Sequence, residues 1–149
     1  MKAFENIRID AGKATILCID DEQDMIAVLV HLLLRGGYAC EGCRDIETAR
    51  QSLERRIPDL IVADINIGDD NGLEFCKQMQ SVNPRLSEVP VIFLSGAEIQ
   101  DVVRRSHDAG GVYFLRKPFD PNVLLELIDK SLWMPHIVRN HVRGQAEVH

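Results

Sequence analysis

The sequence predicts an α/β protein built on a doubly wound, five-stranded parallel sheet. Two observations carry this prediction. First, short runs of apolar residues recur without alternating with polar ones, which is typical of strands buried on both faces of a parallel sheet. Second, segments with helical spacing of apolar residues separate these runs. Regular strand–helix alternation favours a parallel sheet with right-handed crossovers.

The expected strands are runs of mostly apolar residues, several of them β-branched. They are predicted at residues 14–19, 38–43, 60–65, 89–94 and 112–116. The expected helices lie at residues 23–35, 47–56, 72–81, 98–109 and 121–132. Gly36-Gly37 ends the first helix, and Asp120-Pro121 starts the last as N-cap and first helical residue. The helix at 98–109 has few apolar anchors, so we expect it to be the most weakly held.

Length and charge restrict the possible functions. The chain has 149 residues and a formal net charge of −6, which predicts one domain without a broad surface for nucleic acid or anionic membranes. No apolar stretch is long enough to span a bilayer, and residues 1–13 lack the apolar core of a signal peptide. We expect a domain at 14–132, preceded by an extension at 1–13 and followed by a tail or linker at 133–149.

The four cysteines predict a reducing, cytoplasmic location and little else. Cys18 and Cys76 fall on apolar faces and are expected to be small buried hydrophobes. Cys40 and Cys43 have the spacing of zinc and redox sites, but no second pair or histidine cluster completes a ligand set. A structural role for this pair is therefore the favoured interpretation.

Polar side chains follow four of the expected strands. Asp20 and Asp21 follow the first, Asp64 and Ser95 lie at the ends of the third and fourth, and Lys117 follows the fifth. Because parallel strands place their carboxyl ends along one edge of the sheet, where such folds bind ligands, we expect these side chains to converge.

The converging groups suit Mg²⁺ and a phosphoryl group. Mg²⁺ prefers oxygen ligands, and Asp20 and Asp21 can hold it directly or through water. Asp64 is either a further ligand or a nucleophile that attacks phosphorus. Lys117 and the cation would neutralise the phosphoryl oxygens, and Ser95 could donate a hydrogen bond to one of them. Each residue alone is more often a cap or a surface side chain, but the whole set is hard to explain by chance.

Five stretches of the sequence resemble the receiver domain of two-component response regulators. They are CIDDE at 18–22, PDLIVADIN at 58–66, GLE at 72–74, PVIFLSGA at 90–97 and KPF at 117–119. The resemblance covers about residues 14–132. It implies a flavodoxin-like fold with strand order 2-1-3-4-5 and five helices.

The resemblance also implies residue roles. Asp64 would accept a phosphoryl group from a histidine kinase or a histidine phosphotransfer protein. Asp20, Asp21, Asp64 and the backbone carbonyl of Asn66 would bind Mg²⁺. The phosphoryl-contacting and switch residues would be Ser95, Lys117 and Phe114, and the Lys117–Pro118 peptide bond would be cis.

Phosphorylation would then change the surface of the fourth helix, the fifth strand and the last helix. That surface would bind a downstream protein partner or output domain. A phosphorylation-dependent homodimer is a further expected partner state. We expect the chain to promote its own phosphorylation and dephosphorylation, without being an enzyme for a separate substrate. Direct binding to nucleic acid or membranes is not expected.

The sequence departs from the family pattern near Asp64. Gly68 stands four residues after Asp64, where the family usually has proline, and two acids follow it. A more mobile and more acidic loop is expected there. The aromatic switch position is Phe114, which lacks the hydroxyl of tyrosine, and Tyr113 is expected to point to the other face of the strand.

Two other classes of function were weighed. A Mg²⁺-dependent phosphatase of the haloacid dehalogenase type also uses an aspartyl nucleophile, but it needs a second acid two residues later, where this chain has Asn66. The second class is a DNA-binding transcription factor, but residues 133–149 are too few for a helix-turn-helix. Only a longer parent chain could supply it.

Overall fold

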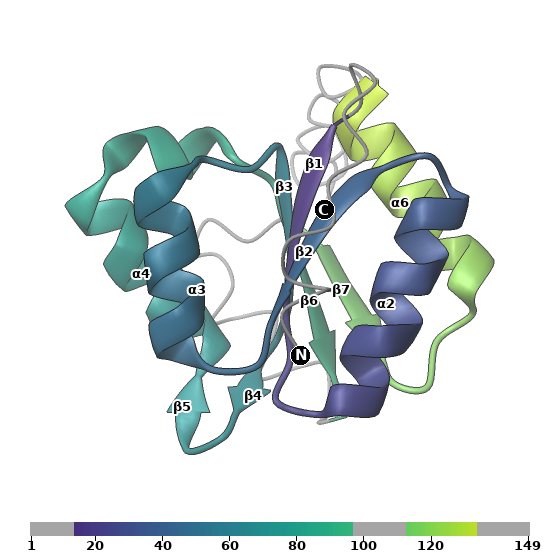
Figure 1. Ribbon diagram of the computed structural model, residues 1–149, viewed down its shortest axis with the longest axis horizontal. Coiled ribbons are helices and arrows are strands. Elements are labelled where there is room, and N and C mark those ends of the chain that lie inside the picture. The colour runs from purple at the N-terminus through teal and green to yellow at the C-terminus, as the bar shows by residue number, and fades with distance from the viewer. Residues whose placement is uncertain (1–13, 97–112, 134–149) are drawn as a thin grey trace, which may run out of the picture.

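The structure is a computed structural model, and it describes residues 14–96 and 113–133. These residues form a sheet of five parallel strands in the order β2-β1-β3-β6-β7 (Figure 1). The strands are β1 (Thr15–Ile19), β2 (Ala39–Cys43), β3 (Leu60–Asp64), β6 (Val91–Ser95) and β7 (Tyr113–Arg116). Counted along the chain, this is the expected order 2-1-3-4-5, so the predicted flavodoxin-like topology is confirmed.

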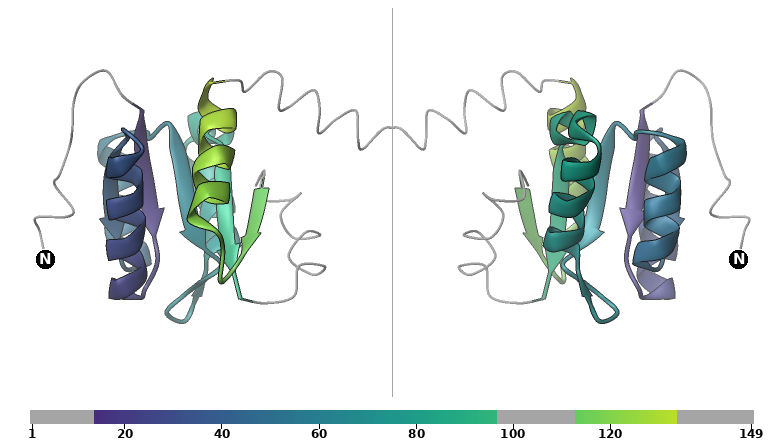
Figure 2. Two further views of the ribbon diagram at one scale, coloured as in Figure 1. Left: turned by 90° about the vertical axis from the view of Figure 1, so that its right-hand side faces the viewer. Right: turned by 90° about the vertical axis from the view of Figure 1, so that its left-hand side faces the viewer.

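Helices cover both faces of the sheet. They are α2 (Gln23–Arg35), α3 (Ile46–Arg55), α4 (Gly72–Val82) and α6 (Pro121–Trp133), with a 3₁₀ helix η1 (Pro84–Glu88) after α4. Helices α2 and α6 lie on one face, and α3 and α4 lie on the other (Figures 1 and 2). None of the helices that the structure describes is both long and apolar enough to cross a membrane. The helix expected at 98–109 lies outside the described residues.

Two apolar cores sandwich the central strands. Along β1, Ile16 and Cys18 pack under α2 and α6, whereas Leu17 and Ile19 pack toward α3 and α4. Every residue of β1, β3 and β6 is buried. Burial on both faces explains why these strands read as continuous apolar runs in the sequence.

The boundaries of the helices follow their capping residues. Helix α2 begins and ends as predicted, and α3 begins one residue early because Asp45 caps it, accepting the N–H of Thr48 at 2.7 Å. At the last helix, Asp120 accepts the N–H of Asn122 at 2.9 Å, in keeping with its expected role at the start of α6.

The acidic segment after β3 is a hairpin rather than an open loop. Strands β4 (Asn66–Ile67) and β5 (Asp70–Asn71) pair antiparallel, and Gly68 begins the turn with a φ of 62°. The hairpin extends past the carboxyl ends of the parallel strands (Figure 2). Its strands are too short and polar to give a periodic pattern, which is why sequence analysis expected a loop.

The cysteine pair Cys40 and Cys43 does not form a ligand pair. The two side chains belong to the cores on opposite faces of β2, and all four cysteines are buried and outside any disulfide. Burial raises the pKa of Cys40 to about 11 and that of Cys76 to about 12, which disfavours the reactive thiolate.

Candidate functional site

The side chains singled out in the sequence meet at the carboxyl edge of the sheet. Asp20 follows β1, Asp64 and Ser95 are the last residues of β3 and β6, and Lys117 follows β7. Strand register brings them level, because Asp64 lies beside Leu94 and Ser95 lies beside Arg116. The Lys117 N–H also donates to the Ser95 carbonyl at 2.8 Å, which extends the β6–β7 pairing into the site.

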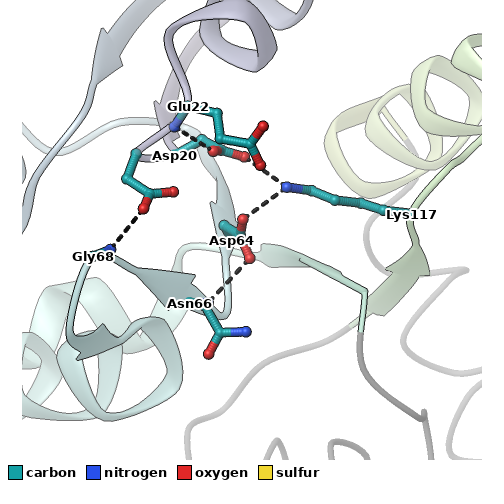
Figure 3. Close-up of polar contacts among 7 residues, drawn as sticks. Asp20, Glu22, Asp64, Asn66, Gly68 and Lys117 are labelled. Carbon is teal, nitrogen blue, oxygen red and sulfur yellow. Dashed lines mark hydrogen bonds and ion pairs between the residues drawn. The ribbon is translucent and has the colours of Figure 1, made fainter.

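Asp20 is the most deeply buried acid of the site, with no exposed surface. Its Oδ1 accepts the N–H of Glu22 at 2.9 Å (Figure 3). Its own N–H donates to the carbonyl of Cys43 at 3.0 Å. Burial raises the pKa of Asp20 above its ordinary value of 3.8, and the Glu22 amide and Lys117 oppose the rise only in part. The fold therefore holds a carboxylate where its charge is costly.

Lys117 lies between two of the acids. Its Nζ donates to Asp64 Oδ2 at 2.7 Å and to Asp20 Oδ2 at 3.0 Å (Figure 3). Burial by itself lowers the pKa of Lys117, but these two hydrogen bonds outweigh it, so the pKa lies above the ordinary 10.5. The ammonium group is thus charged at neutral pH and joins β1, β3 and β7.

Asp64 is held by its surroundings on two sides. Its Oδ1 accepts the N–H of Asn66 at 3.0 Å, while its Oδ2 faces Lys117. Helix α4 begins against its backbone: a Cβ added at Gly72 would lie 2.2 Å from the carbonyl oxygen of Asp64. Glycine at position 72 therefore lets α4 start beside this carboxylate.

Asp21 is the most exposed of the three acids. Its Oδ2 accepts the N–H of Gly68 at 3.0 Å, which connects β1 to the hairpin. Its backbone carbonyl accepts a longer contact of 3.4 Å from the guanidinium of Arg44, at the end of β2. Sequence analysis identified neither contact, because both depend on how distant segments fold together.

One oxygen from each of Asp20, Asp21 and Asp64 lies within 4.8 Å of the others. Ligand oxygens on one octahedral Mg²⁺ lie about 3 to 4 Å apart, so small rotations, or one contact through water, bring all three acids to a single cation. Three carboxylates and one ammonium leave the site two negative charges, which a divalent cation would neutralise. The donor set therefore fits Mg²⁺.

The remaining predicted residues have distinct positions. Ser95 is buried, whereas Asn66 is exposed at the start of the hairpin. Phe114 packs on the α3/α4 side, stacked against Phe93 with ring centroids 5.8 Å apart, and Tyr113 lies in the opposite core as expected. The Lys117–Pro118 peptide bond is cis.

Comparison with known proteins identifies the family. The model of the response regulator receiver domain matches residues 16–129. The chain belongs to this family of receiver domains. It is therefore a receiver of two-component signalling, as the resemblance implied.

Curated relatives of this receiver are transcriptional regulators. The Escherichia coli transcriptional regulatory protein CreB is 31% identical in an alignment of 114 residues that covers 73% of this chain and 46% of CreB. The alkaline phosphatase synthesis transcriptional regulatory protein PhoP of Bacillus subtilis is 30% identical, over 71% of this chain and 43% of PhoP. The receiver thus spans less than half the length of these relatives.

Solved structures share the receiver fold. The chemotaxis response regulator CheY4 of Vibrio cholerae superimposes with a TM-score of 0.75 at 25% identity, covering 80% of this chain and 99% of that one. A signal receiver domain of a histidine kinase from Syntrophus aciditrophicus gives a TM-score of 0.71 at 31% identity, covering 80% and 89%.

Proposed function

We propose that this receiver accepts a phosphoryl group on Asp64 from a histidine kinase or a histidine phosphotransfer protein. The observation that carries the proposal is the position of the Asp64 carboxylate. It lies at the sheet edge, 2.7 Å from the ammonium of Lys117 and within metal-binding range of two further acids. A nucleophile beside a cation and a metal-ligand set suits phosphoryl transfer, which depends mainly on positioning and charge neutralisation.

In the proposed reaction, a carboxylate oxygen of Asp64 attacks the phosphorus of phosphohistidine. A P–O bond forms, the P–N bond breaks, and its electron pair returns to the imidazole of the donor. Lys117 binds a phosphoryl oxygen and Ser95 donates its hydroxyl hydrogen to another. Asp20, Asp21, Asp64 and the backbone carbonyl of Asn66 would hold Mg²⁺, which would supply positive charge to offset the phosphoryl oxygens. Hydrolysis of the acyl phosphate later restores the carboxylate.

The signal would leave the site through Ser95 and Phe114. Ser95 moves toward the phosphoryl group, and Phe114 occupies the space released beside β6. The output surface is then β7, α6 and the segment at 98–109, where a downstream partner, an output domain or a second copy would bind. A switch of this kind needs only a local change of charge that favours one of two conformations.

The relatives are transcriptional regulators by name, so this receiver could control transcription if a DNA-binding output domain accompanies it. We place the receiver in the cytoplasm, where histidine kinases meet their ATP and where free cysteines stay reduced.

Phosphorylation by acetyl phosphate and Mg²⁺ tests the proposal. The protein should gain one phosphoryl group that is stable in acid and labile in base, as intact-mass spectrometry would show. Asp64→Asn should gain none, and chelation of Mg²⁺ should abolish labelling of the unmodified protein. The matched control is Asp69→Asn, which removes an exposed acid of the nearby turn and should be labelled normally. Equal labelling of Asp64→Asn and the unmodified protein would refute the assignment.

A further inference from the structure

A hydrogen bond from the turn of the hairpin reaches the acidic cluster. The backbone N–H of Gly68 donates to Oδ2 of Asp21 at 3.0 Å, across 47 positions of sequence (Figure 3). Asp20 and Asp64 have other partners that fix their carboxylates, namely backbone amides and Lys117. Asp21 is the exposed member of the cluster. Among the described residues, the donor that orients its carboxylate is the backbone amide of Gly68.

The hairpin holds this donor in place. Asn66 pairs with Asn71 and Ile67 pairs with Asp70 on either side of the turn. Ile67 is 2% exposed and packs into the core under α3 and α4, while Asn71 caps α4 by accepting the N–H groups of Leu73 and Glu74. The turn that carries the Gly68 amide is therefore anchored at both ends.

Backbone conformation, rather than packing, explains why glycine suits position 68. Its φ is 62°, and a Cβ added there would meet no atom within 4 Å. Asparagine tolerates this left-handed conformation and keeps the N–H. Proline, the usual residue at this position in the family, can neither adopt a positive φ nor donate. The hydrogen bond to Asp21 is thus a consequence of this chain's departure from the family pattern.

We propose that the Gly68 amide is a positioning group for the divalent cation, and that the cation in turn stabilises the β4–β5 hairpin. This inference rests on the Mg²⁺ site of the proposed function. An ionised carboxylate has about four acceptor positions, so Asp21 can keep its bond to Gly68 and still reach the cation. Because the amide already fixes the Asp21 side chain, binding costs less conformational entropy than it would with a freely rotating carboxylate.

The coupling must act in both directions. If the hairpin-bonded form of Asp21 binds Mg²⁺ more tightly by some factor, Mg²⁺ favours that form by the same factor. Asp21 is exposed to water, so we take the net effect of an ordinary hydrogen bond, which is roughly threefold to tenfold. Saturating Mg²⁺ should therefore slow exchange of the Gly68 amide with solvent by about that factor.

The experiment compares Mg²⁺ affinity in the unmodified protein, Gly68→Asn, Gly68→Pro and Asp21→Asn, by titration followed with amide NMR. Gly68→Asn keeps the donor and the turn, so its affinity should match that of the unmodified protein. Gly68→Pro removes both, and its affinity should fall about threefold to tenfold. Thermal unfolding and the dispersion of the amide spectrum check that each variant is folded, and the Gly68 amide exchange rate in the unmodified protein gives a second, mutation-free reading.

The outcomes separate this inference from the function on which it rests. If Asp21→Asn binds Mg²⁺ as tightly as the unmodified protein, the proposed metal site itself is wrong, and the inference falls with it. If Asp21→Asn loses affinity for Mg²⁺ while Gly68→Pro binds Mg²⁺ as tightly as the unmodified protein or more tightly, the proposed metal site is supported. The positioning role of the Gly68 amide is then overturned. An exchange rate of the Gly68 amide that Mg²⁺ leaves unchanged also overturns it.

Discussion

The positive charge of Lys117 would have one role before Asp64 is phosphorylated and another role afterwards. Without a metal it is the cation that pairs with Asp20 and Asp64, whose side chains are 0% and 9% exposed. A phosphoryl group on Asp64 would draw the ammonium away from the carboxylate. The same residue therefore stabilises the fold before phosphorylation and would bind the phosphoryl group after it.

Replacing Lys117 with methionine tests this dual role. The variant leaves two nearly buried carboxylates without their cation, so the metal-free protein should lose about 2 kcal/mol or more of unfolding free energy. Its site carries one more negative charge, so Mg²⁺ should bind it more tightly and raise its melting temperature more than that of the unmodified protein. Equal Mg²⁺-induced shifts in the two proteins would contradict this account. Thermal unfolding with and without Mg²⁺ supplies the measurement.

The pKa of Asp20 predicts a pH dependence of metal binding. Because burial raises this pKa above 3.8, the folded protein takes up a proton at Asp20 more readily than the unfolded chain does. The cost of burying its charge is thus present above the raised pKa and is relieved as the pH falls through it. Protons and Mg²⁺ compete for the same carboxylate, so Mg²⁺ affinity should begin to fall at a pH above 3.8. Calorimetric titrations from neutral to acidic pH measure this, and a constant affinity down to 3.8 would be the contrary result.

At the scale of elements, helix α4 and β3 meet at Gly72. Gly72→Ala would place a methyl group 2.2 Å from the Asp64 carbonyl oxygen, which is backbone and cannot swing aside. The start of α4 must then shift, and overpacking of this kind costs about 1 to 3 kcal/mol. We expect Gly72→Ala both to lower the free energy of unfolding and to slow phosphorylation by acetyl phosphate. Gly96→Ala, where a Cβ meets nothing within 4 Å, is the matched control and should change both properties little.

Sequence analysis predicted the elements that depend on local pattern and missed those that depend on tertiary contact. Asp20, Asp64 and Ser95 could be placed together because parallel strands end at one edge. The hairpin at 66–71 could not, because its two-residue strands exist through the anchoring of Ile67 and the cap at Asn71. Sequence analysis also missed the hydrogen bonds that the backbone amides of Glu22 and Gly68 donate. Every residue except proline has a backbone N–H, so the residue type does not indicate which amide binds a carboxylate.

At the scale of the whole molecule, a tyrosine hydrogen bond connects helix α6 to the start of the edge strand β2. The Tyr38 hydroxyl, just before β2, donates to Oδ1 of Asp129 on α6. Tyr38→Phe should cost about 1 to 3 kcal/mol in the free energy of unfolding, because the acceptor is charged. Tyr113→Phe is the comparison: its hydroxyl is buried without a hydrogen bond of good geometry among the described residues, so its removal should cost less. Urea unfolding of both variants measures which one loses more free energy of unfolding. An equal loss would be evidence against a stabilising hydrogen bond between Tyr38 and Asp129.

The ammonium of Lys117 bridges residues that are 97 and 53 positions away along the chain. Nearly the whole domain must therefore be synthesised before the Asp64 carboxylate has its cationic partner. Until β7 is in place, a nascent or clipped copy has Asp64 but lacks the group that completes its environment. On the proposed function, we therefore expect efficient phosphorylation of Asp64 to require a chain that extends through Lys117.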